Sequence, residues 1–383
     1  MPLSYRLHAE LAKEHGGDQR WGYRRIHCGQ LTAKGRALGT GDGKNGKKEP
    51  GDSISLQKRS KQAIGTLRAA GIPQDLDWFA AESVKDYDEM GGPDTTAQVH
   101  PYQFTTAMAQ LAAEKGAKII LGSVTHIHQS SYAVHSVTYQ DNETRQPRTI
   151  PATHIILAAG PWTQSLYTPA PISALRAHSV TIRPSRPVSA YALFTDITLP
   201  PSVGARTNET LRATTPHAKR VTPEIYARPN NEVYACGEGD MLVPLPKTTE
   251  DVETDDARCR DIVDYVASIS DELRDGEVTV RQACYLPNVD APGGGPLVGE
   301  TGVRGLLLAA GHTCWGIQNG PGTGKVMSEF VFEGGGEERE GGEFGSEEGV
   351  VGWFWWVEAW CDGRWEDVGR TSELGGQLGF TSL

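Results

Sequence analysis

The sequence predicts an α/β protein in which an α/β domain is interrupted by a layer of antiparallel strands. Two continuous apolar segments, Thr153–Ala159 and Leu306–Ala310, are typical of buried parallel strands, and each runs into a glycine turn. Between them, from Val180 to Gly237, short segments alternate and are separated by turns, which is typical of an antiparallel sheet. The order of these segments therefore predicts one α/β unit with a second layer inserted into it.

Two helices are predicted in the first third of the chain. Leucines recur at helical spacing through the segment Leu3–Lys13. The segment His100–Gly116 has Pro101 at its first helical position and a glycine at its end, which are residues favoured at those places. The other elements predicted here are the strand Trp21–Cys28, the helix Ser53–Ala70 and the short apolar strand Ala117–Leu121.

Further strands and one helical region are predicted along the rest of the chain. Outside the antiparallel layer they are the strands Ser136–Gln140 and Val278–Leu286, a short helix after Trp162 and the acidic helical region Val252–Leu273. Within the layer the predicted strands are Ser179–Arg183, Ser189–Asp196 and Glu232–Cys236.

The segment 295–325 is the most informative part of the sequence. Its predicted strand, Leu306–Ala310, stops at a Gly-His-Thr turn, and the Gly/Pro-rich loop Gly316–Thr323 then leads to a helix predicted from about Thr323 to Phe332. A strand followed by a glycine turn and a helix N-terminus lets backbone N–H groups approach an electron-rich ring or a phosphate. A helix N-terminus also carries about half a positive charge. We therefore expect this turn to contact a ligand.

Composition excludes several classes of protein. Hydrophobic residues make up 38% and charged residues 22% of the chain, which is typical of a globular protein. The net charge of −11 and the absence of a basic stripe argue against a nucleic-acid partner. Six scattered cysteines show no metal-ligand spacing, so no metal site is predicted. Because neither a signal peptide nor an apolar run of roughly 20 residues is present, we expect a cytoplasmic protein without a membrane span.

Two sequence patterns match nucleotide-binding signatures but lack their structural context. Gly41-Asp-Gly-Lys-Asn-Gly46 matches G-x-G-x-x-G, yet no apolar strand precedes it and no apolar helix follows it. Gly322-Thr-Gly-Lys325 resembles the end of a P-loop, but its first glycine and its magnesium-binding hydroxyl are replaced by Asn319 and Val326. Neither pattern is interpreted as a phosphate site.

The order of residues in the segment 295–325 resembles the C-terminal flavin-binding motif of the D-amino-acid oxidase family of FAD-dependent oxidoreductases. The resemblance extends over about Leu3 to Phe332, with specific motifs at 100–125, 154–162 and 281–332. It implies a Rossmann-like FAD-binding domain (1–38, 95–170 and 278–333) interrupted by a substrate domain (39–94 and 171–277). The implied reaction is oxidation of a C–N bond in an amino acid or N-substituted amino acid, with hydride transfer to flavin N5.

The resemblance also implies which residues contact FAD and substrate. The implied FAD contacts are Val124, Ala159, Gly160, Trp162, Gly311, His312, Thr313, Trp315, Gly316, Ile317 and Gln318. Cys284 is a candidate for a covalent tether to FAD. Arginine is the usual bidentate partner of a substrate carboxylate, and the candidates are Arg183, Arg228 and Arg281. Hydride transfer needs alignment more than a strong acid or base, so no catalytic dyad is predicted.

Structural explanations stay open beside these assignments. The small residues at Ala158–Gly160 also suit tight packing, and His312 is equally suited to a structural turn. Cys284 fits an inert buried cysteine, and each candidate arginine fits a surface position. A non-catalytic protein that keeps the fold as a binding scaffold is the alternative function.

Two features depart from the family pattern. Family members begin with a strand, G-x-G-x-x-G and a helix, whereas this sequence starts at a helix that follows them in its relatives. We therefore expect a truncated protein that binds FAD poorly or not at all, whereas the full-length gene product would bind it. The segment 334–383 is low in complexity and rich in tryptophan, and we expect it to lie outside the fold; an aromatic interaction tail is the alternative.

Overall fold

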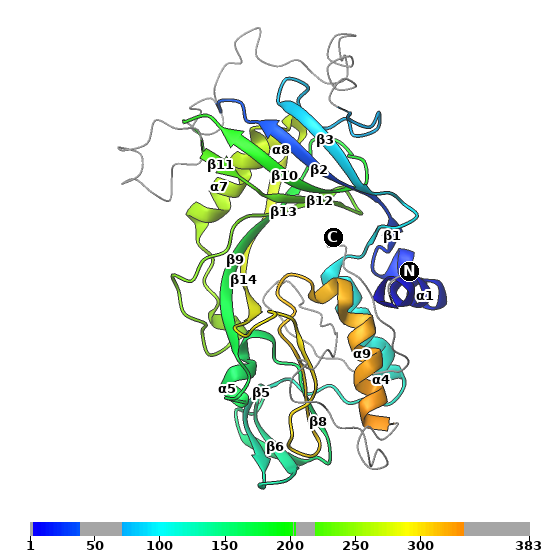
Figure 1. The fold of residues 1–383 in the computed structure, drawn as a ribbon, viewed down its shortest axis with the longest axis vertical. Helices are drawn as coiled ribbons and strands as arrows, with labels where there is room; N and C mark the ends of the chain where they lie inside the picture. Colours follow the sequence, from blue (N-terminus) through cyan, green and yellow to red (C-terminus); the bar gives the residue numbers. More distant parts are fainter. Residues whose placement is uncertain (1–2, 39–70, 202, 204–218, 333–383) are drawn as a thin grey trace.

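The computed structural model describes residues 3–38, 71–201, 203 and 219–332. Within them, one large sheet and three smaller sheets are combined with helices (Figure 1). The predicted mixed α/β architecture with an antiparallel layer is confirmed. The predicted helix Ser53–Ala70 and the C-terminal segment 334–383 lie outside the described residues.

The large sheet forms the antiparallel layer. Its described strands are ordered β14-β9-β13-β12-β10-β2-β3, with β11 also paired to β10, and all neighbours are antiparallel except β2 and β10. The strands are β2 (His27–Lys34), β3 (Val84–Gly91), β9 (Ile172–Arg183), β10 (Tyr191–Leu199), β11 (Lys219–Val221), β12 (Glu224–Arg228), β13 (Glu232–Cys236) and β14 (Glu277–Val289). The segment 27–34, which the sequence analysis assigns to the FAD-binding domain, thus pairs within this sheet. The division of the chain into domains stays a prediction.

Helices α7 (Asp256–Ala267) and α8 (Asp271–Arg274) cover the outer face of the large sheet, as Figure 1 shows. Alternate residues of β9, including Val180 and Ile182, belong to one core cluster with Ile262 and Val266 of α7. The predicted helical region Val252–Leu273 is divided here, since Ser270 accepts a hydrogen bond from the Leu273 N–H and starts α8. One face of the large sheet is therefore covered by α7 and α8, and the opposite face is called its inner face.

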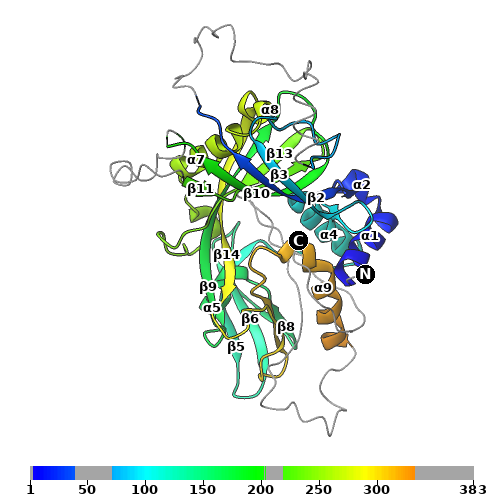
Figure 2. The same cartoon turned by 45° about the horizontal axis from the view of Figure 1, so that its top comes forward.

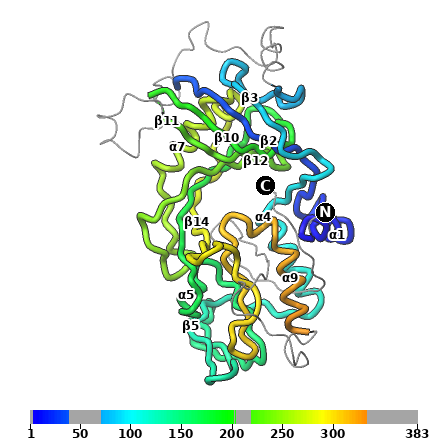
Figure 3. The backbone as a smooth tube through the Cα atoms, viewed as in Figure 1, coloured from blue at the N-terminus to red at the C-terminus, as the bar shows by residue number. Residues whose placement is uncertain are grey.

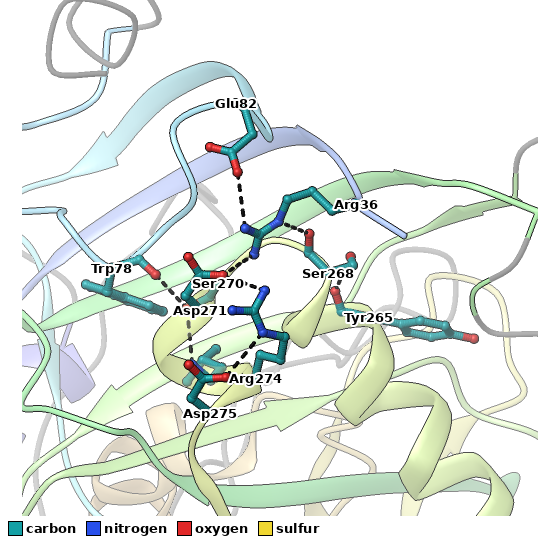
Figure 4. Close-up of polar contacts among 10 residues, drawn as sticks. Arg36, Trp78, Glu82, Tyr265, Ser268, Ser270, Asp271, Arg274 and Asp275 are labelled. Atoms are coloured by element: carbon teal, nitrogen blue, oxygen red, sulfur yellow. Dashed lines mark hydrogen bonds and ion pairs between the residues drawn. The ribbon is translucent and has the colours of Figure 1, made fainter. Parts of the chain in front are cut away.

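An arginine network joins the end of β2 to these helices. Arg36 contacts Asp271 at 2.7 Å and Glu82 at 3.1 Å, and its Nε donates to the Ser268 carbonyl at 3.2 Å (Figure 4). Arg274 contacts the same Asp271 carboxylate at 2.7 Å. Because all of the charged side chains lie at least partly in solvent, the network positions the helices more than it stabilises them.

Four helices lie together on the other side of the molecule (Figure 2). They are α1 (Leu3–His15), α2 (Gly17–Arg20), α4 (Pro101–Glu114) and α9 (Gly316–Phe332). A short ribbon of β1 (Arg24–Arg25) and β4 (Ala97–Gln98) joins them to the large sheet, so the predicted strand Trp21–Cys28 forms only from Arg24 and is interrupted at Ile26. None of the described helices is long and apolar enough to cross a membrane.

Two small sheets lie at the far end of β9 and β14 (Figure 3). One has the order β15-β16-β8, from β15 (Leu297–Glu300), β16 (Leu306–Ala310) and β8 (Ile155–Leu157), with β8 and β16 parallel. The other contains β5 (Gly122–Gln129), β6 (Val134–Asp141) and β7 (Pro147–Pro151). The strand β16 is buried throughout, as predicted, whereas β8 lies at the edge of its described sheet and Ile156 is 38% exposed.

The predicted strand Ala117–Leu121 is wrong. Pairing begins at Gly122, opposite Asp141 of β6, and Ile119, Ile120 and Leu121 are all exposed. Apolar composition favours a strand, but a strand also needs a run of hydrogen bonds to a neighbour, and among the described residues only the Leu121 carbonyl accepts one from beyond the preceding helix, from the Asn142 N–H.

The predicted loop Gly316–Thr323 is also wrong, because α9 is helical from Gly316 with Pro321 inside it. Proline has no N–H, so it cannot bond the carbonyl of Ile317 four residues earlier. Helix α1 compensates for this loss. The His8 Nε2 lies 3.0 Å from the Ile317 carbonyl, and the Ser4 hydroxyl donates to the Asn319 carbonyl and accepts from the Gly322 N–H. The helix thus extends through glycines and a proline because a distant helix completes its hydrogen bonds.

Candidate functional site

Two glycine turns meet at one edge of the parallel pair β8 and β16. Leu157 pairs with Leu308, so both strands end at the same edge, and the turns 158–162 and 311–315 follow them directly. The carboxyl edge of parallel strands is where open α/β sheets usually bind ligands. The structure therefore brings together two motifs that lie about 150 residues apart in the sequence.

The turn after β16 has a constrained backbone. Gly311 and Thr313 both have positive φ angles, 85° and 52°, and the Thr313 N–H donates to the Pro287 carbonyl of β14 at 3.1 Å. A Cβ atom at Gly311 would lie 2.3 Å from Cγ2 of Val289. Only glycine fits such a position, since the side chain would be both strained and overlapped. Packing against β14 therefore explains this glycine.

The turn after β8 is hydrogen-bonded to the segment that follows β13. Gly160 has a φ of 50° and starts the short 3-10 helix η2 (Gly160–Trp162), which leads to α5 (Thr163–Leu166) as the predicted short helix. The indole N–H of Trp162 donates to the Pro246 carbonyl at 2.7 Å. This hydrogen bond fixes the turn relative to the segment that follows β13.

Helix α9 begins directly after the second turn, at Gly316. The N–H groups of its first turn have no acceptor within the helix, and the helix dipole adds positive potential there. His312, in the turn itself, is buried, while Cys314 and Gln318 are exposed. Trp315, Gly316, Ile317 and Gln318 are thus at the helix start, rather than in a loop ahead of it.

The inner face of the large sheet lies opposite α7, and its side chains are polar and, except for the buried Tyr234, partly exposed. We define this inner face by the residues of β12 and β13 that point away from the α7 core: Glu224, Tyr226, Arg228, Glu232, Tyr234 and Cys236. In the register of β12 and β13, Glu224 lies opposite Cys236, Tyr226 opposite Tyr234 and Arg228 opposite Glu232. Burial, followed by the negative charge of Glu224, raises the pKa of the Cys236 thiol.

Glu224 dominates the electrostatics at one end of the inner face. It accepts hydrogen bonds from the Tyr226 hydroxyl and, at 3.8 Å, from the Cys236 thiol. Burial, followed by the negative charge of Glu224, raises the pKa of Tyr226 well above its usual range and that of Cys28 to about 12. Both groups therefore stay protonated at physiological pH, and the Tyr226 hydroxyl acts as a donor to the Glu224 carboxylate.

Arg228 lies at the other end of the inner face. Its guanidinium stacks on the Tyr234 ring at 4.4 Å from the centroid and contacts Glu232 at 2.9 Å. Only 11% of its side chain is exposed. Both contacts hold the guanidinium in one orientation and leave most of its five N–H groups for other acceptors.

The structure separates the three candidate arginines. Arg228 lies on the inner face, but Arg183 ends β9, is 59% exposed and pairs with Glu277 at 2.7 Å. Arg281 is exposed and is paired with Val180, on the side of the sheet that packs against α7. Of the three, Arg228 is therefore the one placed to meet a ligand between the inner face and the turns.

Two other predicted contacts lie in different surroundings. Val124 is in β5, 41% exposed, in the sheet formed by β5, β6 and β7. Cys284 is partly buried in β14, pairs with Ala177, and lies close enough to Tyr234 to contribute to its raised pKa, after burial and Cys236. Both assignments, and the tether above all, stay predictions.

A cavity of about 250 Å³ opens on the covered side of the sheet and is separate from the two turns. Its lining mixes basic and acidic side chains, including His178, Lys219, Arg258, Glu238 and Asp261. The described residues contain no cluster of side chains that could bind a metal ion.

The chain belongs to the D-amino-acid oxidase (DAO) family of FAD-dependent oxidoreductases, whose family model, described as FAD dependent oxidoreductase, matches residues 3–330. Two relatives are yeast proteins, each 31% identical over 87% of this chain. They are "Putative oxidoreductase TDA3" of Saccharomyces cerevisiae, covered over 80% of its length, and "Putative oxidoreductase C1F5.03c" of Schizosaccharomyces pombe, covered over 77%. The family predicted from the sequence is thereby confirmed.

Solved structures show the same fold. Glycine oxidase from Bacillus cereus matches with a TM-score of 0.57 at 14% identity, over 88% of this chain and 81% of its own. L-Proline dehydrogenase from P. horikoshii matches with a TM-score of 0.55 at 14% identity, over 86% and 77%. Identities this low establish the fold alone.

The residues at the second turn fit the ring end of a flavin. Two-electron reduction places negative charge on the pyrimidine side of the ring, and backbone N–H groups at a helix start suit that charge. Gly311 has no side chain, and the backbone at Gly311 and Thr313 takes positive φ angles as it leads to those N–H groups. Contacts of the residues Gly311–Gln318 with the ring stay a prediction.

Sequence reasoning missed the inner face as a unit. Glu224-Ile-Tyr-Ala-Arg228 and Glu232-Val-Tyr-Ala-Cys236 share one alternation of polar and apolar residues, which could have indicated that both glutamates and both tyrosines share a face. It also missed His8 and Ser4, whose role depends on contacts more than 300 residues away in the sequence.

Proposed function

We propose that this protein oxidises a C–N bond of an amino acid or N-substituted amino acid, using FAD bound with its ring at the two glycine turns. The observation that carries the proposal is the meeting of those turns at the carboxyl edge of β8 and β16, with the inner face and Arg228 on the adjoining sheet. Family membership supports the cofactor and the reaction class.

The chain's own residues have three tasks in this proposal. The first-turn N–H groups of α9 and His312 would hold the electron-rich edge of the ring, and positive potential there would favour reduction. Arg228 holds the substrate carboxylate by charge-assisted hydrogen bonds. The Tyr226 ring, whose centroid lies 6.0 Å from that of the buried Tyr234, presents an apolar surface that orients the substrate carbon chain. FAD, when bound, accepts the hydride from the carbon that carries the nitrogen.

Anaerobic reduction tests the proposed function. We expect purified protein, supplied with excess FAD, to lose its visible flavin absorbance when D- or L-amino acids, sarcosine or proline are added without oxygen. The matching 2-hydroxy acids, which lack the C–N bond, should leave the absorbance unchanged. Bleaching by no amine at all would refute the proposal and favour the scaffold function. Peroxide formed on readmission of oxygen would identify oxygen as the electron acceptor, whereas reoxidation only by a carrier would identify a dehydrogenase.

A further inference from the structure

The inner face carries two opposite charges at a fixed separation. Glu224 and Arg228 lie four residues apart on β12, with side chains on the same face, so their Cα atoms are about 13 Å apart. Tyr226 lies between them on that face. The arrangement therefore presents, in order along one strand, a carboxylate, an aromatic ring and a guanidinium.

Each charged group is held at its own end. Glu224 accepts hydrogen bonds from Tyr226 and Cys236, while Arg228 is stacked on Tyr234 and bound to Glu232. Glu224 and Arg228 do not form an ion pair with each other. Both charges therefore remain available to a ligand that extends over the Tyr226 ring.

The two ends of the inner face differ in whether a group of opposite charge lies beside the charged side chain. Arg228 has the Glu232 carboxylate at 2.9 Å. Glu224 makes no ion pair within the described part of the chain, and its hydrogen-bond donors are a phenol and a thiol, both neutral. A partly buried carboxylate without a cation is costly, and binding a cation would recover that cost. The end of the inner face at Glu224 therefore favours a positively charged ligand group.

We propose that the inner face selects amino acids with a positively charged side chain, with the α-carboxylate at Arg228 and the distal cation at Glu224. The inference rests on the proposed function, since it names the substrate class for that site. An α-ammonium and a carboxylate on the same carbon are too close together to reach both ends, whereas a distal cation on a long side chain reaches Glu224. The Tyr226 ring then contacts the intervening methylene groups and adds a cation–π attraction.

Lysine, norleucine and cadaverine form a matched set for the test. Norleucine has the carbon chain of lysine without its terminal amine, and cadaverine lacks its carboxylate. Calorimetric titration of the FAD-supplemented protein with each ligand, in both configurations for the two amino acids, should show lysine binding about tenfold to a hundredfold more tightly than norleucine and more tightly than cadaverine. We expect Glu224→Gln to abolish the preference for lysine over norleucine. Asp196→Asn removes a carboxylate of β10 that is already paired with Arg220, and should preserve it.

A second variant distinguishes loss of the lysine preference through removal of the charge from loss through destabilisation of the protein. Glu224→Lys should reverse the preference, so that glutamate binds more tightly than norleucine, and a destabilised protein would not produce that reversal. Equal affinity for lysine and norleucine in the wild type, or a lysine preference retained in Glu224→Gln, would overturn the inference. If norleucine nevertheless bleaches the flavin, the proposed function stands and only the substrate class is wrong.

Discussion

Replacing Gly311 by alanine should destabilise the protein by about 2–5 kcal/mol. Two effects add: a Cβ in the left-handed region costs about 1–2 kcal/mol, and overpacking costs about 1–3 kcal/mol. The overlap is severe because Cγ2 of Val289, 2.3 Å from the added Cβ, belongs to a branched side chain that is stiff. The turn cannot move away easily, since the Thr313 N–H is bonded to Pro287 in the same strand, β14.

Gly302→Ala is the matched control for that prediction. Gly302 has nearly the same φ, 84°, but a Cβ there would meet nothing within 4 Å. Its substitution should therefore cost only the conformational part, about 1–2 kcal/mol. Urea unfolding followed by circular dichroism measures both changes. Equal losses in the two variants would show that the contact between the turn and β14 is not as tight as described.

The free energy of unfolding should fall steeply as the pH drops from about 6.5 to 4. Complete burial of His8 lowers its pKa to about 4, since desolvation disfavours the charged imidazolium. The unfolded chain, with an ordinary histidine pKa of about 6.5, binds the proton more readily across this interval. Stability from neutral His8 is therefore fully present above pH 6.5 and is lost as the pH falls to 4, by about 3 kcal/mol.

His178 provides an internal comparison. Burial and then the charges of Arg176 and Arg258 lower its pKa to about 4 as well, so it acts in the same pH interval. Urea unfolding between pH 4 and 7 should show that His8→Gln and His178→Asn each remove about half of the pH dependence contributed by the pair. An undiminished slope in His8→Gln would contradict the assignment of His8 as a buried neutral donor to α9.

Local sequence signals identified the elements whose hydrogen bonds are local. The strand 306–310 was predicted at its observed bounds because five apolar residues stop at a glycine, and the helix beginning at Pro101 was predicted because its start and stop residues are adjacent to it. The start of α9 was missed because its stability comes from Ser4 and His8 of a distant helix. The false strand 117–121 failed for the complementary reason, since apolar residues alone do not supply a neighbouring strand.

In the candidate site, too, local motifs could be recognised from the sequence, whereas contacts between distant segments could not. The two glycine turns could be identified from motifs, but their meeting depends on the parallel pairing of β8 with β16. Arg228 could be named but not distinguished from Arg183 and Arg281, because only the sheet register determines which face a side chain occupies. Glu224 was not identified at all, since its neighbours across the sheet are defined by that register.

The proposed placement of the flavin ring at the start of α9 can be tested through the reduction potential of bound FAD. Gln318→Glu adds a negative charge in the first turn of α9, where it should disfavour the reduced ring and lower the midpoint potential of bound FAD by about 10–30 mV. The control, Gln103→Glu, adds the same charge in the first turn of α4 and should leave the potential unchanged. Potentials recorded by spectroelectrochemistry with the protein in excess over FAD would support the account if only Gln318→Glu shifts them. Equal potentials in the wild type and both variants would contradict it.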